Sequence, residues 1–551
     1  MINKSGGKLL IEALEVNGVQ TVFGVPGESY LEALDALSET ASTIQYISCR
    51  QEGGASFMAG AYARLTGKPG ICFVTRGPGA ANASIGVHTA YQDSAPMILL
   101  VGQVPRSSID REAFQEIDYR RMYGEMSKWV AQVDDAGRLP EYVNRAFQTA
   151  LSGRPGPVVL VLPEDMLLEE TDAPLLGAAN PLQAHPGAAD LARLCEMLEA
   201  ASKPLILLGG SVWTDDARRA FESFARTNSL PVAAAFRRQD VFDNHHESYV
   251  GDVAWGNIAS LTRALGECDL LVLCGARLNA GTSCNYSVLQ PPLLRQKLIH
   301  IYPGAEELGR VYKADLMINS GVCEMAYALQ EVKLESCDRW SDWSRVARQG
   351  YLDSLTASPQ PGDLDMGLVM AHLREVLPRD TIVTTGAGNF ADWPNKIFQY
   401  SGCGTCLSPI SGAMGFGVPA AVAASLTCPD RSVVCFTGDG DFLMNGQEMA
   451  TAAQYGGKPI ILVINNNLYG TIRMHQQSRH PGRVSGTELK NPDFAMYAKS
   501  FGAYSETVSR TEDFAPAFAR AQASGNMALL DLQIDPESIC YNMPPLSELG
   551  Q

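Results

Sequence analysis

Short runs of apolar residues recur along the chain, and most of them end in a glycine-rich or polar turn. Runs that are apolar throughout are typical of strands buried on both faces of a parallel sheet. Parallel strands need crossover connections, so the alanine-rich segments between the runs are predicted to be helices. The chain is therefore expected to be α/β, with doubly wound parallel sheets. The predicted strands are residues 21–25, 44–48, 70–75, 97–102, 157–162, 203–208, 230–234, 270–274, 297–301, 381–385, 432–437, 459–464 and 528–534.

Two weakly patterned segments interrupt this alternation. Residues 173–189 and 354–363 are rich in Pro, Gly, Ala and Ser. A chain of 551 residues is long enough to form several buried cores. We therefore predict three α/β domains of similar size, at residues 1–172, 186–345 and 360–551.

Composition and charge narrow the class of protein. The chain has 46% hydrophobic and 19% charged residues, as globular proteins do, and a formal net charge of −17. That charge argues against nucleic acid or an anionic membrane as the main partner. The start lacks the apolar core of a signal peptide, and no run of about twenty apolar residues predicts a membrane span. Several of the thirteen cysteines lie inside predicted strands, as free thiols of cytoplasmic proteins do. We expect a cytoplasmic protein that acts on small molecules.

The most specific motif joins two predicted strands. Asp439, within Gly438-Asp439-Gly440, follows one strand, and Asn466 follows the next strand, 27 positions further along. The helical composition of residues 445–455 predicts a strand–helix–strand unit, which brings both strand ends to the same edge of a sheet. A carboxylate, an amide oxygen and the N–H groups of a glycine turn suit a hard cation that bridges to phosphates.

A second glycine motif follows the predicted strand at residues 381–385. Residues 386–391 read GAGNFA, and a GxGxxA pattern after a strand favours a dinucleotide-binding turn. That turn also requires an acidic residue about twenty positions further along, to bind the ribose. No Asp or Glu occurs between Asp392 and Asp430. We therefore expect these glycines to contact another phosphate group.

The spaced GDG…NN pattern resembles the signature of thiamine-diphosphate-dependent enzymes. Residues 23–27 (FGVPG), 50–54 (RQEGG) and 75–79 (TRGPG) are similar to the pyrimidine-binding domain of the same family. The resemblance covers nearly the whole chain and implies pyrimidine-binding, central and diphosphate-binding domains, with thiamine diphosphate and Mg²⁺ as cofactors. It is most specific for the acetolactate-synthase branch, to which residues 90–96, 101–104, 113–116, 154–163 and 439–451 are similar.

The resemblance also implies roles for individual residues. Glu52 matches the glutamate that exchanges a proton with the cofactor's aminopyrimidine ring, so it is the implied catalytic residue. Met414 matches the apolar residue that wedges between the two cofactor rings, and the carbonyl of Gly412 would accept a hydrogen bond from the amino group. Magnesium would be held by Asp439, Asn466 and the carbonyl of Leu468. The implied cofactor-binding residues are Pro26, Glu52, Gly388, Asn389, Gly412, Met414, Gly438, Asp439, Gly440, Asp441, Asn466, Leu468, Tyr469 and Gly470.

The positions implied to contact substrate depart from the acetolactate-synthase branch. They are Arg76, Gln103, Phe114, Gln115, Thr471 and His475. Arg76 replaces a Ser, Thr471 replaces a Met, and His475 stands where Trp or a similar residue is usual. In the central domain, residues 277–279 read Arg-Leu-Asn where the branch has Arg-Phe-Asp, and its second Arg is missing. In the family those positions recognise the 2-oxo acid or flank a flavin, so the departures put both pyruvate specificity and FAD, a possible further cofactor, in doubt.

The resemblance implies a thiamine-diphosphate- and magnesium-dependent carboligase that decarboxylates a 2-oxo acid and joins the remaining fragment to a second carbonyl compound. Two alternatives stay open. One is a lyase or decarboxylase acting on another 2-oxo acid or on a 2-hydroxyacyl thioester. The other is a catalytically silent, cofactor-binding regulatory protein. In the family the two halves of the cofactor site come from different subunits. A homodimer or homotetramer with active sites at the subunit interface is therefore expected.

Overall fold

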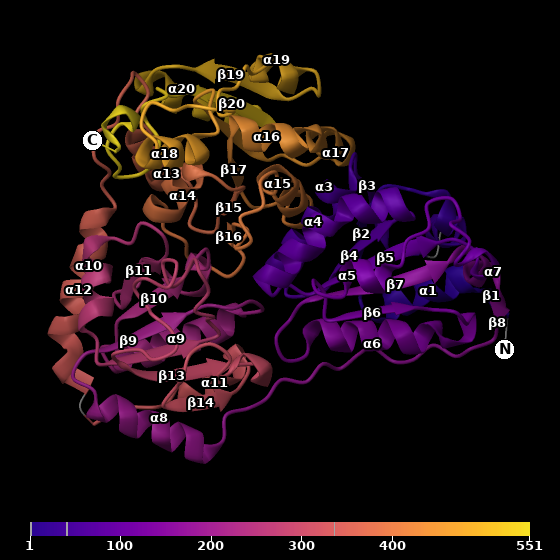
Figure 1. Ribbon diagram of the computed structural model, residues 1–551, viewed down its shortest axis with the longest axis horizontal. Helices are drawn as coiled ribbons and strands as arrows, with labels where there is room; N and C mark the ends of the chain where they lie inside the picture. Colours follow the sequence, from indigo (N-terminus) through magenta and orange to yellow (C-terminus); the bar gives the residue numbers. More distant parts are fainter. Residues whose placement is uncertain (1–2, 40–41, 336, 551) are drawn as a thin grey trace. The chain divides into compact units, whose positions relative to one another are not determined.

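The computed structural model describes residues 3–39, 42–335 and 337–550 and divides into two compact units. The first unit is formed by Met1–Leu182 together with two segments from far along the chain, Val422–Thr427 and Asn445–Gly457. The second unit contains the remaining residues. Figure 1 shows the elements of both units, coloured along the sequence. No helix among the described residues has the length and apolar character needed to cross a membrane.

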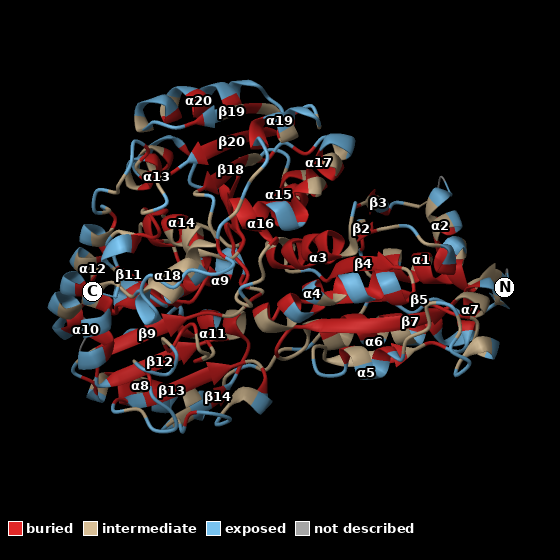
Figure 2. Ribbon diagram, turned by 45° about the horizontal axis from the view of Figure 1, so that its top comes forward, coloured by how far each residue is buried: buried red, intermediate tan, exposed pale blue. Residues whose placement is uncertain are grey.

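The first unit is built on a six-stranded parallel sheet in the order β3-β2-β4-β5-β7-β6. The central strands β4, β5 and β7 are buried along their whole length, as Figure 2 shows. A short antiparallel pair, β1 and β8, lies outside this sheet. The strands are β1 (Lys4–Ser5), β2 (Thr21–Gly24), β3 (Gln45–Ser48), β4 (Gly70–Val74), β5 (Met97–Gln103), β6 (Trp129–Gln132), β7 (Pro157–Pro163) and β8 (Glu170–Thr171).

Helices cover both faces of this sheet. Residues of α1 and α6 share one core cluster with Phe73, Leu100 and Leu160 of the central strands. On the other face, α3 packs so closely that a Cβ on Gly70 of β4 would lie 1.9 Å from the Ala59 carbonyl oxygen. The helices are α1 (Gly6–Val16), α2 (Leu31–Ser38), α3 (Glu52–Thr66), α4 (Gly77–Asp93), α5 (Tyr119–Tyr123), α6 (Leu139–Leu151), α7 (Glu164–Leu168) and, from the distant segment, α17 (Met449–Tyr455).

The second unit contains two six-stranded parallel sheets. The central sheet has the order β11-β10-β9-β12-β13-β14, and the C-terminal sheet has the order β16-β15-β17-β18-β20-β19. Their strands are β9 (Pro204–Leu208), β10 (Val232–Ala235), β11 (Tyr249–Val253), β12 (Leu270–Cys274), β13 (Lys297–Tyr302), β14 (Leu316–Asn319), β15 (Ile382–Thr385), β16 (Cys406–Leu407), β17 (Val433–Gly438), β18 (Ile460–Asn465), β19 (Tyr504–Val508) and β20 (Ala528–Gln533). The α/β class and the parallel sheets are as predicted.

The crossover helices of the second unit are mostly amphipathic, buried on the side of the sheet and exposed on the other (Figure 2). They are α8 (Ala188–Ala200), α9 (Asp215–Thr227), α10 (Ala259–Glu267), α11 (Val322–Leu329), α12 (Ser341–Ser354), α13 (Met366–Val376), α14 (Asp392–Ile397), α16 (Asp439–Asn445), α18 (Gly470–Arg479), α19 (Phe494–Lys499) and α20 (Thr511–Ala523). Helix α15 (Gly417–Thr427) belongs to this unit in its first half and to the first unit in its second half. Strand β17 runs directly into α16, which thus begins earlier than the helix predicted at residues 445–455.

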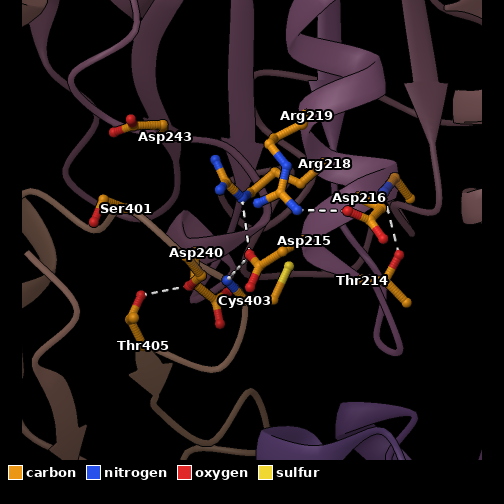
Figure 3. A network of polar contacts seen from close by, with 12 residues as sticks. Thr214, Asp215, Asp216, Arg218, Arg219, Asp240, Asp243, Ser401, Cys403 and Thr405 are labelled. Atoms are coloured by element: carbon orange, nitrogen blue, oxygen red, sulfur yellow. Dashed lines mark hydrogen bonds and ion pairs between the residues drawn. The ribbon is translucent and has the colours of Figure 1, made fainter. Parts of the chain in front are cut away.

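Within the second unit, polar side chains of α9 and of the turn after β10 fix the loop that leads to β16. The Asp215 carboxylate accepts from the Cys403 backbone N–H (3.2 Å) and from the Arg218 guanidinium (3.2 Å), as Figure 3 shows. The Asp240 carboxylate accepts from the Gly404 N–H at 3.0 Å. A buried ion pair joins Lys396 of α14 to the Asp252 carboxylate at 3.0 Å. The segment that enters β16 is thereby held from two sides.

The predicted strands are all present, with ends that move by at most two residues. The strands that the pattern did not predict lie at sheet edges: β6, β11, β14, β16 and β19. These strands are very short or contain glycine and polar residues, as in β11 (YVGDV) and β19 (YSETV), so they lack the continuous apolar run that marks a central strand. The two-residue strands β1 and β8 were also missed, because two residues carry no periodic pattern.

Candidate active site

Asp439 and Asn466 lie at the carboxyl ends of adjacent strands of the C-terminal sheet. The parallel register pairs Gly438 of β17 with Ile464 of β18, so Asp439 and Asn466 leave the sheet at the same edge. Such an edge is where ligands bind in open α/β sheets. The sequence prediction that the strand–helix–strand unit brings these two ends together is correct.

The side chains of this pair are held by short-range contacts. Asp439 is 3% exposed, and its Oδ1 accepts from the Gly440 N–H at 2.9 Å. Asn466 Oδ1 accepts from the Leu468 N–H at 3.1 Å, which orients the amide oxygen. Burial raises the pKa of the Asp439 carboxyl, and hydrogen bonds from Asn491 and Gly440 oppose that shift. A carboxylate and an amide oxygen are ligands that a hard divalent cation accepts, so this donor set fits Mg²⁺.

Asn491 completes this arrangement and was not predicted from the sequence. Its Nδ2 lies 2.7 Å from Asp439 Oδ2, 3.1 Å from Asn465 Oδ1 and 3.2 Å from Asn467 Oδ1. It thus connects the ends of β17 and β18. Asn491 has no local signal, because it lies in a segment without regular structure and makes these contacts only in the folded chain.

Two backbone hydrogen bonds fix the turn that carries Asn466. The Leu489 N–H donates to the Asn467 carbonyl (2.8 Å), and the Tyr469 N–H donates to the Thr487 carbonyl (2.9 Å). Asn467 adopts a left-handed conformation with φ of 57°, which Asn tolerates better than most residues. The turn therefore presents the Leu468 carbonyl and the start of α18 in a fixed geometry.

The first N–H groups of α18 suit an anion. The helix begins at Gly470, immediately after Leu468 and Tyr469, and its first-turn N–H groups have no acceptor within the helix. Such a helix N-terminus binds phosphate oxygens well. A Cβ on Gly440 would meet the Tyr469 ring at 2.5 Å, so the close approach of this turn to the start of α16 requires glycine.

The glycine motif after β15 lies at the same sheet edge. Gly388 has φ of 155°, in the region that favours glycine, and the Asn389 N–H donates to Thr471 Oγ1 at 3.0 Å. The Thr471 hydroxyl in turn donates to Asn389 Oδ1 at 2.8 Å. Two residues predicted for different roles, diphosphate binding and substrate contact, are therefore bonded to each other. His475 lies one turn further along the same helix, α18.

Asp441 is enclosed and holds three turns together. Its Oδ1 accepts from the Gly415 N–H (2.9 Å) and the Ala387 N–H (3.1 Å), and its Oδ2 accepts from the Thr437 hydroxyl (2.7 Å). Burial raises the pKa of Asp441 to about 6. Its predicted contact with the diphosphate stays a prediction, since the structure shows the carboxylate satisfied by these groups.

The segment that carries Gly412 and Met414 is positioned by its neighbours. Gly412 has φ of 68° and nothing within 4 Å of a Cβ placed there, so open space lies beside it. The Arg237 guanidinium donates to the Pro409 carbonyl at 2.5 Å, and Asp441 holds Gly415 on the other side. Met414 is half-buried between these two anchored points.

Glu52 lies in the first unit, as the first residue of α3. Its carboxylate accepts from Asn82 Nδ2 of α4 at 2.9 Å. A Cβ on Gly79 would lie 3.2 Å from Glu52 Oε1, so the GPG turn passes directly beside the carboxylate. The turn that contains Pro26 also touches the turn before α4, because a Cβ on Gly27 would lie 2.4 Å from Thr75 Cβ. Three glycine motifs of the first unit thus meet around Glu52. Asn82 was not predicted.

The predicted substrate residues of the first unit differ in their burial and in their bonding partners. The Arg76 guanidinium is buried and paired, with Glu164 at 2.6 Å and Glu28 at 3.2 Å. The amide of Gln103 is bonded to backbone groups, accepting from the Val104 N–H and donating to the Ile117 carbonyl.

The other two predicted substrate residues of this unit follow Ile109. The Gln115 carbonyl accepts from the Gly77 N–H at 2.9 Å, with Gln115 itself at φ of 68°. Phe114 is 73% exposed. An aromatic side chain so open to solvent is available to a ligand or to another protein surface.

Comparison with known proteins assigns the class. Models of the N-terminal, central and C-terminal domains of thiamine pyrophosphate enzymes match residues 4–122, 191–329 and 386–532. These matches and the three parallel sheets define a thiamine-diphosphate-dependent enzyme.

Curated relatives narrow the branch. The acetolactate synthase large subunit of Parasynechococcus marenigrum (strain WH8102) is 33% identical, over 98% of this chain and 89% of that protein. The acetolactate synthase isozyme 2 large subunit of Escherichia coli (strain K12) is 31% identical, over 98% of both chains. The acetolactate synthase large subunit of Corynebacterium glutamicum is 30% identical, over 94% of this chain and 84% of that protein. The chain belongs to the thiamine-diphosphate-dependent enzymes, on their acetolactate-synthase-like branch.

Proposed function

We propose that the protein is a thiamine-diphosphate- and magnesium-dependent carboligase that decarboxylates a 2-oxo acid and joins the remaining fragment to a second carbonyl compound. The observation that carries the proposal is the Asp439–Asn466 pair at one strand edge, with the first N–H groups of α18 beside it. The proposed reaction follows from the relatives, which are named acetolactate synthase large subunits and align with this chain over nearly their whole length. The retained Glu52, held by Asn82, supports an active enzyme.

Each half of the site would hold one part of the cofactor. Asp439, Asn466 and the Leu468 carbonyl would ligate Mg²⁺, which neutralises the diphosphate. The N–H group of Gly470 would donate to a diphosphate oxygen, and Gly440, Gly388 and Asn389 would line the same edge. Local N–H donors and a cation are needed to hold the diphosphate, because the chain's net charge of −17 offers no general attraction for an anion.

The cofactor, when bound, would supply a carbon nucleophile for the keto carbon of the substrate and an electron sink for the electron pair left behind when carbon dioxide departs. Glu52 would hold and release a proton at the aminopyrimidine ring, and Asn82 would keep the carboxylate in place for that transfer. Met414 would orient the two rings by its bulk, and the Gly412 carbonyl would accept from the amino group.

Substrate recognition is proposed to differ from that of the relatives. The two carboxylates beside Arg76 offset its positive charge, so it is a poor partner for the carboxylate of a 2-oxo acid. Phe114, Gln103 and Gln115 remain candidates in the first unit, and Thr471 and His475 in the second. FAD is a doubtful further cofactor, since residues 277–279 differ from the branch pattern.

We also propose a homodimer or homotetramer, with the half-site around Glu52 facing the half-site around Asp439 of another subunit. We further propose that the protein is cytoplasmic and that its three domains span residues 1–172, 186–345 and 360–551. Sedimentation analysis of the purified protein tests the assembly: an active monomer would contradict it.

Product analysis tests the reaction. The purified protein, with thiamine diphosphate and Mg²⁺, is supplied with pyruvate, other 2-oxo acids and 2-hydroxyacyl thioesters, and carbon dioxide and ligated products are measured. Ligated product from a 2-oxo acid is expected. Cleavage of a thioester without ligation would favour a lyase instead. Glu52→Gln serves as the matched control, because any activity that survives it unchanged does not use Glu52 for proton transfer.

A further inference from the structure

The turn that carries Glu52 is held by a segment from almost four hundred residues further along the chain. A 3₁₀ turn, Gly446–Glu448, leads directly into α17, and both belong to the first compact unit. Their side chains reach β3 and the residues between β3 and α3. Glu52 itself is the first residue of α3, so whatever fixes this turn also fixes the position of Glu52.

Glu448 makes the principal contact. Its Oε1 accepts from the backbone N–H groups of Gln51 (3.0 Å) and Arg50 (3.1 Å), which are the two residues before Glu52. Its Oε2 accepts from the Thr451 hydroxyl at 2.6 Å. The side chain is completely buried, at 0% exposure. A buried carboxylate is costly unless its oxygens are bonded, so these contacts account for its presence there.

The fit around Glu448 is tight on the other side too. A Cβ on Gly54 would lie 2.6 Å from Glu448 Oε1 and 2.9 Å from its Cγ. Any larger residue at position 54 would push the carboxylate away from the turn. The Gln51 side chain accepts from the Gly54 N–H at 3.1 Å and caps the same helix end. The position of the Glu448 carboxylate therefore depends on glycine at position 54.

Further along α17, other side chains bind the same stretch of chain. The Tyr455 hydroxyl accepts from the Ser48 N–H at 2.9 Å, at the end of β3. The Arg50 guanidinium donates to Gln454 Oε1 at 2.6 Å, but this contact is at the surface. The Gln454 contact touches only a side chain, whereas Glu448 and Tyr455 hold backbone N–H groups.

We propose that Glu448 is a positioning residue for Glu52: by accepting from the two backbone N–H groups before α3, it fixes the place from which the Glu52 carboxylate acts. The role rests on the proposed function for its catalytic meaning. It requires the two acceptor contacts of Oε1 and not the negative charge, because backbone N–H groups donate to a neutral amide oxygen as well as to a carboxylate oxygen. Burial raises the pKa of the Glu448 carboxyl.

The variants separate geometry from charge. Glu448→Gln keeps an oxygen acceptor at the same reach, Glu448→Ala removes it, and Gly54→Ala displaces it from the opposite side. Gln454→Ala is the matched control: Gln454 lies on α17, the helix that directly follows Glu448, and it also contacts Arg50. Thermal unfolding of each variant shows whether it folds. If Glu448→Ala does not fold, Glu448→Gln and Gly54→Ala still test the proposal.

The first readout needs no cofactor. Deuterium uptake of peptides covering residues 46–56 reports how firmly the turn is held. We expect uptake to rise several-fold in Glu448→Ala and Gly54→Ala, and to stay at the level of the unmodified protein in Glu448→Gln and Gln454→Ala. Equal uptake in all variants would overturn the proposal.

The second readout is the rate at which the reactive C–H of bound thiamine diphosphate exchanges its proton for deuterium, measured after acid quench. We expect a loss of about tenfold or more in Glu448→Ala and Gly54→Ala, and a rate within about threefold of the unmodified protein in Glu448→Gln. Exchange at the unmodified rate in Glu448→Ala would refute the positioning role. If Glu52→Gln also exchanges at that rate, the proposed function of Glu52 fails instead, while the uptake measurement still decides what Glu448 holds.

Discussion

Removing the Asn491 amide is expected to weaken Mg²⁺ binding at the proposed site without removing any of the proposed ligands. Asn491 Nδ2 donates to Asp439 Oδ2 at 2.7 Å and also lies within hydrogen-bond distance of two amide oxygens at the end of β18. In Asn491→Ala, the Asp439 carboxylate loses its only side-chain donor among the described hydrogen bonds and gains freedom to rotate. The segment that pairs with the Asn466 turn loses one of its anchors as well.

The magnitude follows from the type of bond. A hydrogen bond to a charged group contributes about 1.5–3 kcal/mol, and its short length places it among the stronger ones. A loss of about 2 kcal/mol corresponds to roughly 30-fold in a dissociation constant. Residues that orient metal ligands typically change metal affinity by about 10–100-fold when removed. We therefore expect the Kd for Mg²⁺ to rise by about 10–100-fold.

The assay is calorimetric titration of Mg²⁺ into metal-stripped protein at a fixed concentration of thiamine diphosphate. Asn526→Ala is the control. Asn526 lies just before β20, at the amino-terminal end of the strands of the same sheet, and donates to the Gly502 carbonyl. An unchanged Kd in Asn491→Ala would refute the reasoning. A lower Kd would refute it differently, by showing that Asn491 competes with the metal for the carboxylate.

Two further predictions concern charge. Arg76→Met leaves the carboxylates of Glu28 and Glu164 without their shared cation, so its melting temperature should fall by several degrees, and the additional change Glu164→Gln should recover part of the loss; a normal melting temperature with a raised KM would instead assign Arg76 to the substrate. His300 is buried, and burial lowers its pKa to about 4. As the pH falls, the His300 side chain therefore binds a proton near pH 6.5 in the unfolded chain but only near pH 4 in the native protein. Stability is thus lost as the pH falls through this window, by about 2 kcal/mol at pH 5 from this residue. His300→Gln should lose about 2 kcal/mol less between pH 7 and pH 5 in urea unfolding, and equal losses would contradict the assignment.

The sequence was sufficient for the buried strands and for placing Asp439 and Asn466 at the ends of adjacent strands. Strands such as β5 and β7 are apolar at every position because both faces are covered, and that pattern is local. Strand β19, with Ser and Glu among its five residues, has an edge position and no such pattern. Its place in the sheet is decided by pairing with β20, which comes later in the chain.

The residues that support the site were beyond sequence reasoning. Asn82, Glu448 and Asn491 each act through one or a few hydrogen bonds to groups far away in sequence or outside any regular element. A single Asn or Glu has no spacing that could mark such a role. Asp441 differs from them: the motif predicts a ligand contact, which stays a prediction, and the structure adds that Ala387, Gly415 and Thr437 donate to its carboxylate.

The discontinuous first unit has a consequence for synthesis. Its sheet is complete when residue 182 has been made, but the segment Asn445–Gly457, which supplies Glu448 and Tyr455, is translated much later. At roughly 5–20 residues per second, the ribosome needs about 15–50 s to reach it. During that interval β3 is an edge strand whose Ser48 N–H lacks the Tyr455 acceptor. Nascent chains arrested before residue 445 should therefore be more prone to aggregate than longer ones, since an uncovered edge can pair with another chain.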